Sequence, residues 1–513
     1  MVLQQIKAAG KFTLFFSRAF FISFHVFRKI LINDGSLSSF FARPQGSSYF
    51  LKGPMKLFLP KLLSFLTSLS AVVWMKYSNL LLLSAGYSRT QVGSLKSLGY
   101  FIKLGATPLW ALCSDTYGDP VVPLIISYVG GVFTLEMFRA TVLLSPNQFN
   151  KLIGVRIIRS GMNAVAPLTD ALILRYTEQA KIENEGYGRQ RLFSSVAWGL
   201  GAWGGGILVD KYSLWSIFPF TQGTYFSVLF VLISMKLIDK RKNTRDAKAK
   251  AKSRAALVVV PIISPTNDGL NESGGQKTKT QAHRSSPMDV IRSTGTMLMT
   301  RSIRPFCFQI VLLGFMMVLV DTVLPLQIEH LNFSRSFNGL TTLISIVATV
   351  PIFWNSDRVY RAKGAKEMIR IAFIALTVRL VLLSSPLGEE PWFILFVQCS
   401  HGISFAMGWV AAVERMRSFA NDVAGGGTEI MATAQAIVTA LYFTIGQGVG
   451  NVFWLKLFDY LVPADSEGSP AKLYFFGSCV ILLNLKIGLK DLGDHHHNDI
   501  KKQKKEETSK HLV

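Results

Sequence analysis

Apolar residues in this chain come in blocks of about 20, the length that an α-helix needs to cross roughly 30 Å of hydrocarbon. A closed β-barrel would instead need strands of about ten residues that alternate between apolar and polar, and these blocks do not alternate. The sequence therefore predicts an all-α membrane protein with twelve transmembrane helices. The expected spans are 57–83, 91–112, 121–144, 149–176, 192–210, 217–238, 303–328, 337–355, 367–385, 392–413, 427–452 and 471–489.

Charged residues are scarce but predominantly basic. They make up 17% of the chain, against about 25% in a typical soluble protein, and the net charge is +24. If the N-terminus is cytoplasmic, most Lys and Arg residues fall in cytoplasmic segments, which is the distribution of the positive-inside rule. We therefore expect both termini to be cytoplasmic and the basic segments to contact anionic lipid. Binding to nucleic acid is not expected, and neither is a metal or cofactor site.

The distribution of apolar and polar residues divides the chain into five parts. Residues 57–238 and 303–490 are expected to form two six-helix bundles. Residues 239–302, which are basic and too polar to bury a core, predict a flexible cytoplasmic linker between them. Residues 1–56 are either an organelle-targeting segment or a plain cytosolic extension, and 491–513 form a polar tail.

Two segments about 242 residues apart have nearly the same pattern, which indicates a duplication. Thr107–Asp115 and Val350–Asp357 each end an apolar block with Pro, aromatic residues and Ser-Asp. Gly-rich runs near 199–206 and 446–450 also correspond. Many transporters built from repeated halves bind their substrate between the two halves. The repeat predicts a pseudo-symmetric pair of bundles with a site between them.

Several motifs carry a resemblance to a known family. They are Pro108 to Gly118, Ala166 to Ala171, Gly186 to Ser195, His401 to Met407, and Gly446 to Gly450. With these motifs the chain resembles the major facilitator superfamily, in the branch of the facilitator-superfamily associated domain, near lactose-permease-like and nucleoside–proton-symporter-like proteins. One departure stands out, because Thr116, Tyr117 and Asp119 stand where the family's loop motif carries basic residues.

The resemblance implies that the first, fourth, seventh and tenth helices line a central cavity. Each of these expected helices carries an ionisable residue: Lys76, then Arg156 and Arg159, then Asp321, then His401. Such a group at membrane depth costs about 3 kcal/mol on insertion scales, so it usually faces a cavity or a partner.

Each of these residues has a functional and a structural interpretation. His401 either carries a proton, as a group with a reference pKa near 6.5 can, or joins two helices as a neutral hydrogen-bond partner. Asp321 either serves as the acid partner or reaches toward the outer surface. Arg159 either binds substrate or holds Asp321, and its structural interpretation is a static salt bridge between helices. Trp409 either stacks on a solute ring or packs structurally. A gating or structural role is expected for Asp115, Asp170, Asp357, Gly161 and Gly402.

Together these features predict a monomeric secondary transporter that works by alternating access. The expected activity is proton-coupled symport of a small polar solute, of the sugar or nucleoside class. The alternative is a transporter-derived receptor or scaffold that moves nothing. An enzyme is not expected, because no nucleophile, base and orienting group stand at suggestive spacing.

Overall fold

The computed structural model describes residues 58–117, 119–145, 148–180, 187–257, 303–424, 437–462 and 469–488, and all regular structure within them is helical. The N-terminal half contains α4 (Phe58–Ser84), α5 (Arg89–Tyr117), α6 (Val121–Leu144), α7 (Phe149–Met162), α8 (Ala166–Ala180), α9 (Tyr187–Tyr212), the 3-10 turn η1 (Leu214–Ser216) and α10 (Ile217–Leu257). The C-terminal half contains α12 (Arg304–Val318), the π-helix η2 (Leu319–Val323), α13 (Leu324–His330), α14 (Arg335–Trp354), α15 (Ser356–Ser384), the 3-10 turn η3 (Pro386–Glu389), α16 (Pro391–Gln398), the π-helix η4 (Gly402–Ala406), α17 (Met407–Ala424), the π-helix η5 (Ala440–Gln447), α19 (Gly448–Leu461) and α20 (Ala471–Ile487).

The predicted all-α membrane class is confirmed. Each expected span overlaps a helix or a broken helix, and six helical segments of the described chain are long and apolar enough to cross a membrane. The eleventh helix extends to Leu461, nine residues past its predicted end at 452, and residues 427–436 of that predicted span lie outside the described residues.

The linker begins as helix. α10 continues past residue 238 to Leu257, through a stretch rich in Ala, Lys and Arg. These residues have high helix propensity even where no packing supports them. The expectations for residues 1–56 and 491–513 and for the rest of the linker lie outside the described residues.

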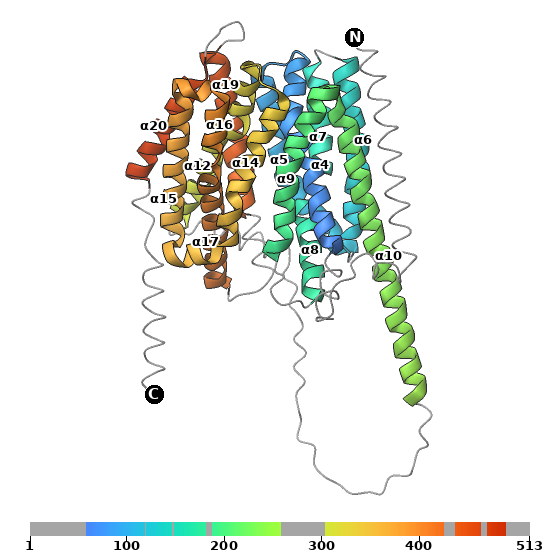
Figure 1. Cartoon of the computed structure of the whole chain (residues 1–513). Coiled ribbons are helices and arrows are strands. Elements are labelled where there is room, and N and C mark those ends of the chain that lie inside the picture. Colours follow the sequence, from blue (N-terminus) through green and yellow to red (C-terminus); the bar gives the residue numbers. More distant parts are fainter. Residues whose placement is uncertain are drawn as a thin grey trace, which may run out of the picture.

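The two halves lie side by side, and their helices run roughly parallel to one another (Figure 1). The extension of α10 leaves the bundle at one end, which we call the linker end, and the connections at 85–88, 213–216, 331–334 and 385–390 lie at the opposite end, which we call the loop end. The duplicated prolines occupy matching places, because Pro108 lies near the linker end of α5 and Pro351 near the linker end of α14. The predicted correspondence of the two halves is therefore visible in the helices themselves.

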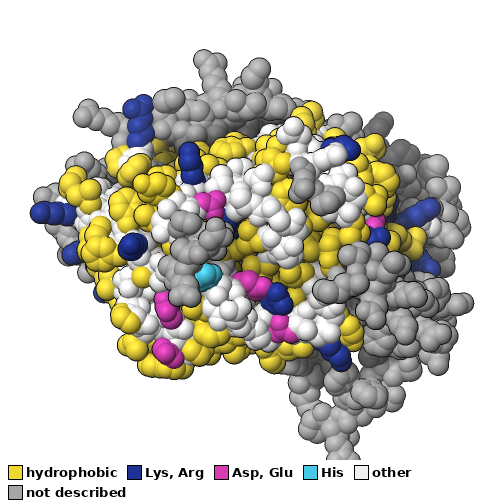
Figure 2. Space-filling model, turned by 90° about the horizontal axis from the view of Figure 1, so that it is seen from above, with side chains coloured by type: hydrophobic (Ala, Val, Ile, Leu, Met, Phe, Trp, Pro, Cys, Tyr) yellow, Lys and Arg dark blue, Asp and Glu magenta, His cyan; other side chains and the backbone are white. Residues whose placement is uncertain are grey.

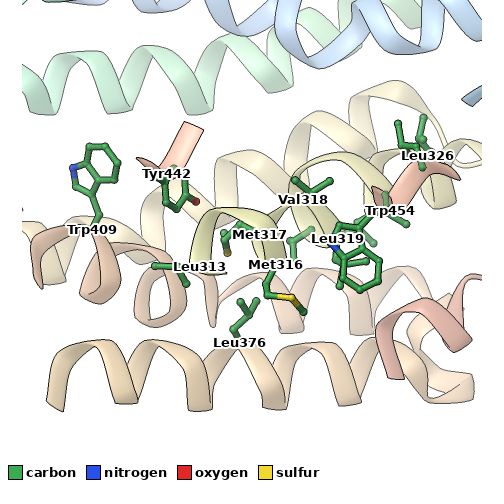
Figure 3. Close-up of a cluster of buried hydrophobic side chains, with 14 of the residues drawn as sticks. Leu313, Met316, Met317, Val318, Leu319, Leu326, Leu376, Trp409, Tyr442 and Trp454 are labelled. Atoms are coloured by element: carbon green, nitrogen blue, oxygen red, sulfur yellow. The ribbon is translucent and has the colours of Figure 1, made fainter. Parts of the chain in front are cut away.

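Buried apolar side chains hold each half together. In the C-terminal half, α12 is the central helix, and its Met316 and Met317 are fully buried close to Leu376 of α15 and Trp454 of α19 (Figure 3). Large apolar side chains also face outward: Phe133 is 68% exposed and Phe396 is 64% exposed. Outward apolar side chains suit contact with lipid tails better than contact with water.

Small residues let the halves approach closely at the loop end. Gly206 of α9 lies against the backbone carbonyl of Arg335, and Gly339 of α14 lies against the carbonyl of Ala202. Tyr77 of α4 donates its hydroxyl to the Ala202 carbonyl at 2.6 Å and reaches the Arg335 carbonyl at 3.2 Å. Side chains this small are common where membrane helices pack backbone to backbone. Within the Gly-rich run of α9, Gly199 and Gly206 thus contact the other half.

Candidate functional site

Two carboxylates fasten the halves together at the loop end. Asp210, near the end of α9, accepts hydrogen bonds from the backbone N–H groups of Arg335 and Ser336 at 2.9 and 2.8 Å. Asp459, near the end of α19, accepts from the backbone N–H and the hydroxyl of Thr90 at 2.8 and 2.5 Å. The first N–H groups of a helix have no partner within that helix, and the helix dipole favours an anion there. Each half therefore caps a helix of the other half.

The loop end is closed in this conformation. Seen from that end, acidic and basic side chains lie beside one another between apolar ones (Figure 2). The hydrogen bonds between described residues of the two halves run from these two caps down to the Tyr100–Gln447 pair and no nearer to the linker end. Among the described residues, the hydrogen bonds between the halves are therefore concentrated between the loop end and the middle of the bundle.

Asp321 lies at this middle level and is exposed to solvent. Its carboxylate accepts a hydrogen bond from the Gln447 side-chain amide at 2.9 Å, and the amide oxygen of Gln447 accepts from the Tyr100 hydroxyl at 2.9 Å. Since Tyr100 belongs to α5, this chain of bonds crosses from one half to the other. Asp321 also lies within the π-helix η2, a type of distortion that is frequent at functional sites.

A second polar chain runs parallel to the first. The Lys96 ammonium of α5 donates to the Thr322 hydroxyl at 2.5 Å, and Thr322 donates to the Asn451 side-chain oxygen at 3.0 Å. The charges that act on Asp321 are those of Lys96, Arg379 and Lys76. Asp321 makes no direct ion pair with any described residue, so these cations attract it through space.

Basic residues outnumber acidic ones at this level. We define the central basic cluster as six residues whose charges act on one another or on Asp321. They are Lys76 of α4, Lys96 and Lys103 of α5, Arg156 and Arg159 of α7, and Arg379 of α15. Three of these charges, those of Lys76, Lys96 and Arg379, act on Asp321, and no other acid of the described residues acts on the cluster. The arrangement therefore favours negative charge in the space between the halves.

Arg156 and Arg159 point to different surroundings. The guanidinium of Arg156 lies against Gly99, and its Nε donates to the Leu95 carbonyl of α5 at 3.0 Å. Arg159 is 2% exposed, and its guanidinium lies 4.2 Å from the ring centroid of Trp74. Arg159 also donates to the carbonyl of Gly131 at 3.3 Å. Arg159 forms no ion pair with Asp321 among the described residues. The structure therefore shows no contact that would let Arg159 hold Asp321.

His401 is joined to Arg379 rather than to an acid. Its Nδ1 lies 2.8 Å from a terminal nitrogen of Arg379, which is fully buried, and another terminal nitrogen of Arg379 donates to the side-chain oxygen of Gln398. A guanidinium can only donate, so Nδ1 accepts and the imidazole is neutral in this arrangement. The histidine directly precedes the π-helix η4, and its ring stacks on Phe405.

Aromatic rings form a wall beside the polar chains. Trp409 is buried and packs on Phe405, Tyr442 and Phe443, with ring centroids 6.0, 5.6 and 5.7 Å away. Phe443 in turn stacks on Tyr100 at 6.5 Å. The wall thus extends from α17 through η5 to the Tyr100 hydroxyl that binds Gln447. Its position allows a ring-shaped group to be held next to the charged residues.

The residues expected to act in gating or structure are spread along the helices. Asp170 is half-buried on α8. Gly161 accepts a hydrogen bond from the Trp110 indole at 2.8 Å, and Gly402 lies against the Ala348 carbonyl of α14. Asp115 and Asp357 lie near the end of α5 and at the start of α15, and their side chains fall outside the described residues.

Sequence reasoning missed Lys96 and Lys103, which lie on the second spanning helix. Lys96, Tyr100 and Lys103 follow the spacing i, i+4, i+7 and so share one face of α5. That spacing was the available signal. The two capping acids Asp210 and Asp459 also carried a signal, since each falls near the end of the corresponding helix in its half.

Comparisons with known proteins agree with this architecture. The model of the MFS_1 like family matches residues 62–460. A maltose permease of Geobacillus stearothermophilus is 22% identical over 400 residues, which cover 78% of this chain and 85% of the permease.

Solved transporter structures share the fold. A crystal structure of a mutant of the nucleoside transporter NupG has a TM-score of 0.65 at 13% identity, over 85% of this chain and 100% of that one. The crystal structure of a D-xylose-proton symporter has a TM-score of 0.55 at 13% identity, over 86% and 97%. Because the family model covers most of the chain, the protein belongs to the MFS_1 like family and is a membrane transporter of the major facilitator superfamily rather than an enzyme.

Proposed function

We propose that the protein is a proton-coupled symporter of a small polar solute and works by alternating access. The observation that carries the proposal is the position of Asp321. Of the acids in the described residues it is the one that acts on the central cluster, it is exposed to solvent, and it is bonded through Gln447 to Tyr100 of the other half.

Protonation of Asp321 would weaken the link between the halves. The negative charge attracts Lys76 and Lys96, both of which belong to the N-terminal half. A neutral carboxyl loses that attraction, and its hydrogen bond from Gln447 is no longer charge-assisted. A proton on Asp321, together with bound solute, would then favour the rocking motion that opens the loop end.

The sugar or nucleoside class is supported by the relatives. The names of the similar proteins are maltose permease, nucleoside transporter and D-xylose-proton symporter. The aromatic wall around Trp409 suits a ring-shaped solute, and Gln447, Tyr100 and Lys96 supply hydrogen-bonding groups beside it. A few polar groups set within an apolar wall are the usual composition of a small-molecule site.

The test is proton entry into liposomes that contain the purified protein and a pH-sensitive dye. Sugars, nucleosides and their charged derivatives are added one at a time without an imposed gradient. We expect one solute class to drive protons inward. Asp321→Asn should abolish proton entry while leaving exchange of labelled solute across the membrane intact, since a neutral side chain there can no longer carry the proton.

Glu367→Gln is the matched control, because it removes one acid from the linker end of α15, away from the boundary between the halves. His401→Ala tests the second candidate for the proton. If neither Asp321→Asn nor His401→Ala changed pH-driven uptake, proton coupling would be wrong and an uncoupled facilitator would take its place.

A further inference from the structure

The positive charge of the central basic cluster exceeds the negative charge of the described acids that act on it. We propose that the transported solute carries a compact anionic group, and specifically that it is a phosphate ester of the sugar or nucleoside class whose phosphate binds Lys103 and Arg156. This inference rests on the proposed function, since it names the solute that the same space would carry.

Three members of the cluster have donors that no described residue uses. Lys76 and Lys103 are half-buried, and neither ammonium has a hydrogen bond or an ion pair with a described residue. Arg156 uses its Nε on the Leu95 carbonyl, while its terminal nitrogens make no hydrogen bond to a described residue. These unused donors are reachable by a ligand that enters between the halves.

The acids of the described chain do not balance these three cations. Asp321 acts on Lys76 but not on Lys103 or Arg156; Lys103 is influenced by Arg156 and Arg159, and Arg156 by Arg159 and Tyr100. Glu136 is paired with Arg139 at 2.7 Å. Asp170 and Glu414 contact other groups and do not act on the three cations. A cluster of like charges away from bulk water is unfavourable without a counter-charge, so the counter-charge comes from a bound anion.

Phosphate matches the geometry of the donors. Its terminal oxygens accept several hydrogen bonds at once, and the planar fork of an arginine can bind two of them together with flanking ammonium groups. Lys103 shares a helical face with Tyr100, one turn closer to the linker end. Tyr100 stacks on Phe443, which packs on Trp409. The phosphate would therefore lie at Lys103 and Arg156, with the ring of the same molecule toward the aromatic wall.

The experiment compares matched charged and neutral solutes in counterflow. Liposomes containing the full-length protein are loaded with unlabelled glucose, glucose 6-phosphate, glucuronate, uridine or uridine monophosphate, and uptake of the same labelled compound is measured. We expect at least one phosphate ester to exchange more than ten times faster than its neutral parent. Excess inorganic phosphate should compete with that ester if the anionic group itself is recognised.

Variants connect the selectivity to the cluster. Lys103→Gln and Arg156→Gln should each lower exchange of the ester at least tenfold, whereas Lys103→Arg should retain it. Lys151→Gln, an exposed change at the loop end of α7, should leave exchange unchanged. Gel filtration and thermal unfolding in detergent show whether each variant is folded, and Lys103→Met replaces Lys103→Gln if that variant is not.

The outcomes separate this inference from the proposed function. Exchange of the neutral parent at an equal or higher rate, unaffected by the variants, would overturn the phosphate inference and leave the transporter proposal standing. Exchange of glucuronate alone would replace phosphate by carboxylate and overturn the specific class. Competition by inorganic phosphate without movement of any ester would mean an adventitious ion only. If no solute exchanged and distances between the halves never changed, alternating access itself would be wrong.

Discussion

Asp459 of α19 reaches across the boundary between the halves and accepts two hydrogen bonds from one residue, Thr90, at the first turn of α5. Asp210 repeats this arrangement on α14 with the backbone N–H groups of Arg335 and Ser336. Both acids lie near the loop ends of their helices. The duplication has therefore produced two related closures, one at each contact between the halves. If only one of these contacts were broken, the other would still hold the loop end shut.

Removing both charges should open the loop end. The variant Asp210→Asn/Asp459→Asn keeps the side-chain size but loses the charge-assisted hydrogen bonds, which are worth about 1.5–3 kcal/mol each in other proteins. A change of about 1.4 kcal/mol shifts an equilibrium tenfold. We expect a longer distance between spin labels placed at Ser145 and Leu387, on loop-end connections of different halves. Glu367→Gln, at the linker end, should leave that distance unchanged, and an unchanged distance in the double variant would show that the caps do not hold the closure.

The close contact of α9 and α14 gives a second way to disturb the same end. A Cβ atom at Gly206 would overlap the Arg335 carbonyl, whereas at Gly204 it would meet nothing within 4 Å. Gly206→Ala should therefore force the helices apart at a cost of about 1–3 kcal/mol. Gly204→Ala should be neutral or stabilising by up to about 1 kcal/mol, because alanine is the better helix former. Thermal unfolding and the same spin-label distance test both variants, and equal behaviour of the pair would contradict the packing argument.

The sequence predicted the helices well, because a membrane span is determined by the length of an apolar block along the chain. An apolar block of sufficient length must be helical in lipid, and the block over 121–144 gave the bounds of α6 residue for residue. The block predicted over 427–452 ended too early, because the helix continues through Lys456 and Asp459 beyond the apolar stretch. Those two residues lie in the last turns, where Asp459 serves the loop-end cap.

The candidate site could be predicted only in part, because the neighbour that a side chain faces around its helix depends on how the helices pack together. Asp321 and Arg156 were found as ionisable residues at membrane depth. Arg159 is about 60° around the helix from Arg156, and that rotation suffices to turn it to Trp74 instead of the boundary between the halves. The π-helix that carries Asp321 has no sequence signature of its own. The spacing of Lys96, Tyr100 and Lys103 indicates a shared face of the helix, but only the structure shows that Lys96 bonds to the other half.

The Arg379–His401 contact predicts a strong coupling between the two residues. His401→Leu alone removes an acceptor from a fully buried guanidinium, which already has one nitrogen without a partner, and should cost about 1–3 kcal/mol of stability. Arg379→Leu/His401→Leu removes both polar groups, while Gln398 keeps its hydrogen bond from Ser345 at 2.8 Å. The double variant should therefore unfold at a higher temperature than the sum of the single changes implies. Additive losses would mean that the contact contributes nothing to stability.

Arg159 and Arg156 should separate stability from solute recognition. Arg159 is buried against the face of Trp74, and a desolvated cation–π contact is worth about 2 kcal/mol. Arg159→Met should therefore lower the unfolding temperature in detergent while the solute selectivity of the remaining folded protein stays the same. Arg156→Met should change solute selectivity and lower the unfolding temperature less, because it removes one hydrogen bond, from Nε to the Leu95 carbonyl, while the terminal nitrogens make none to a described residue. A change of selectivity in Arg159→Met, with Arg156→Met unaffected, would exchange the roles of the two arginines and place the solute against α4 rather than α5.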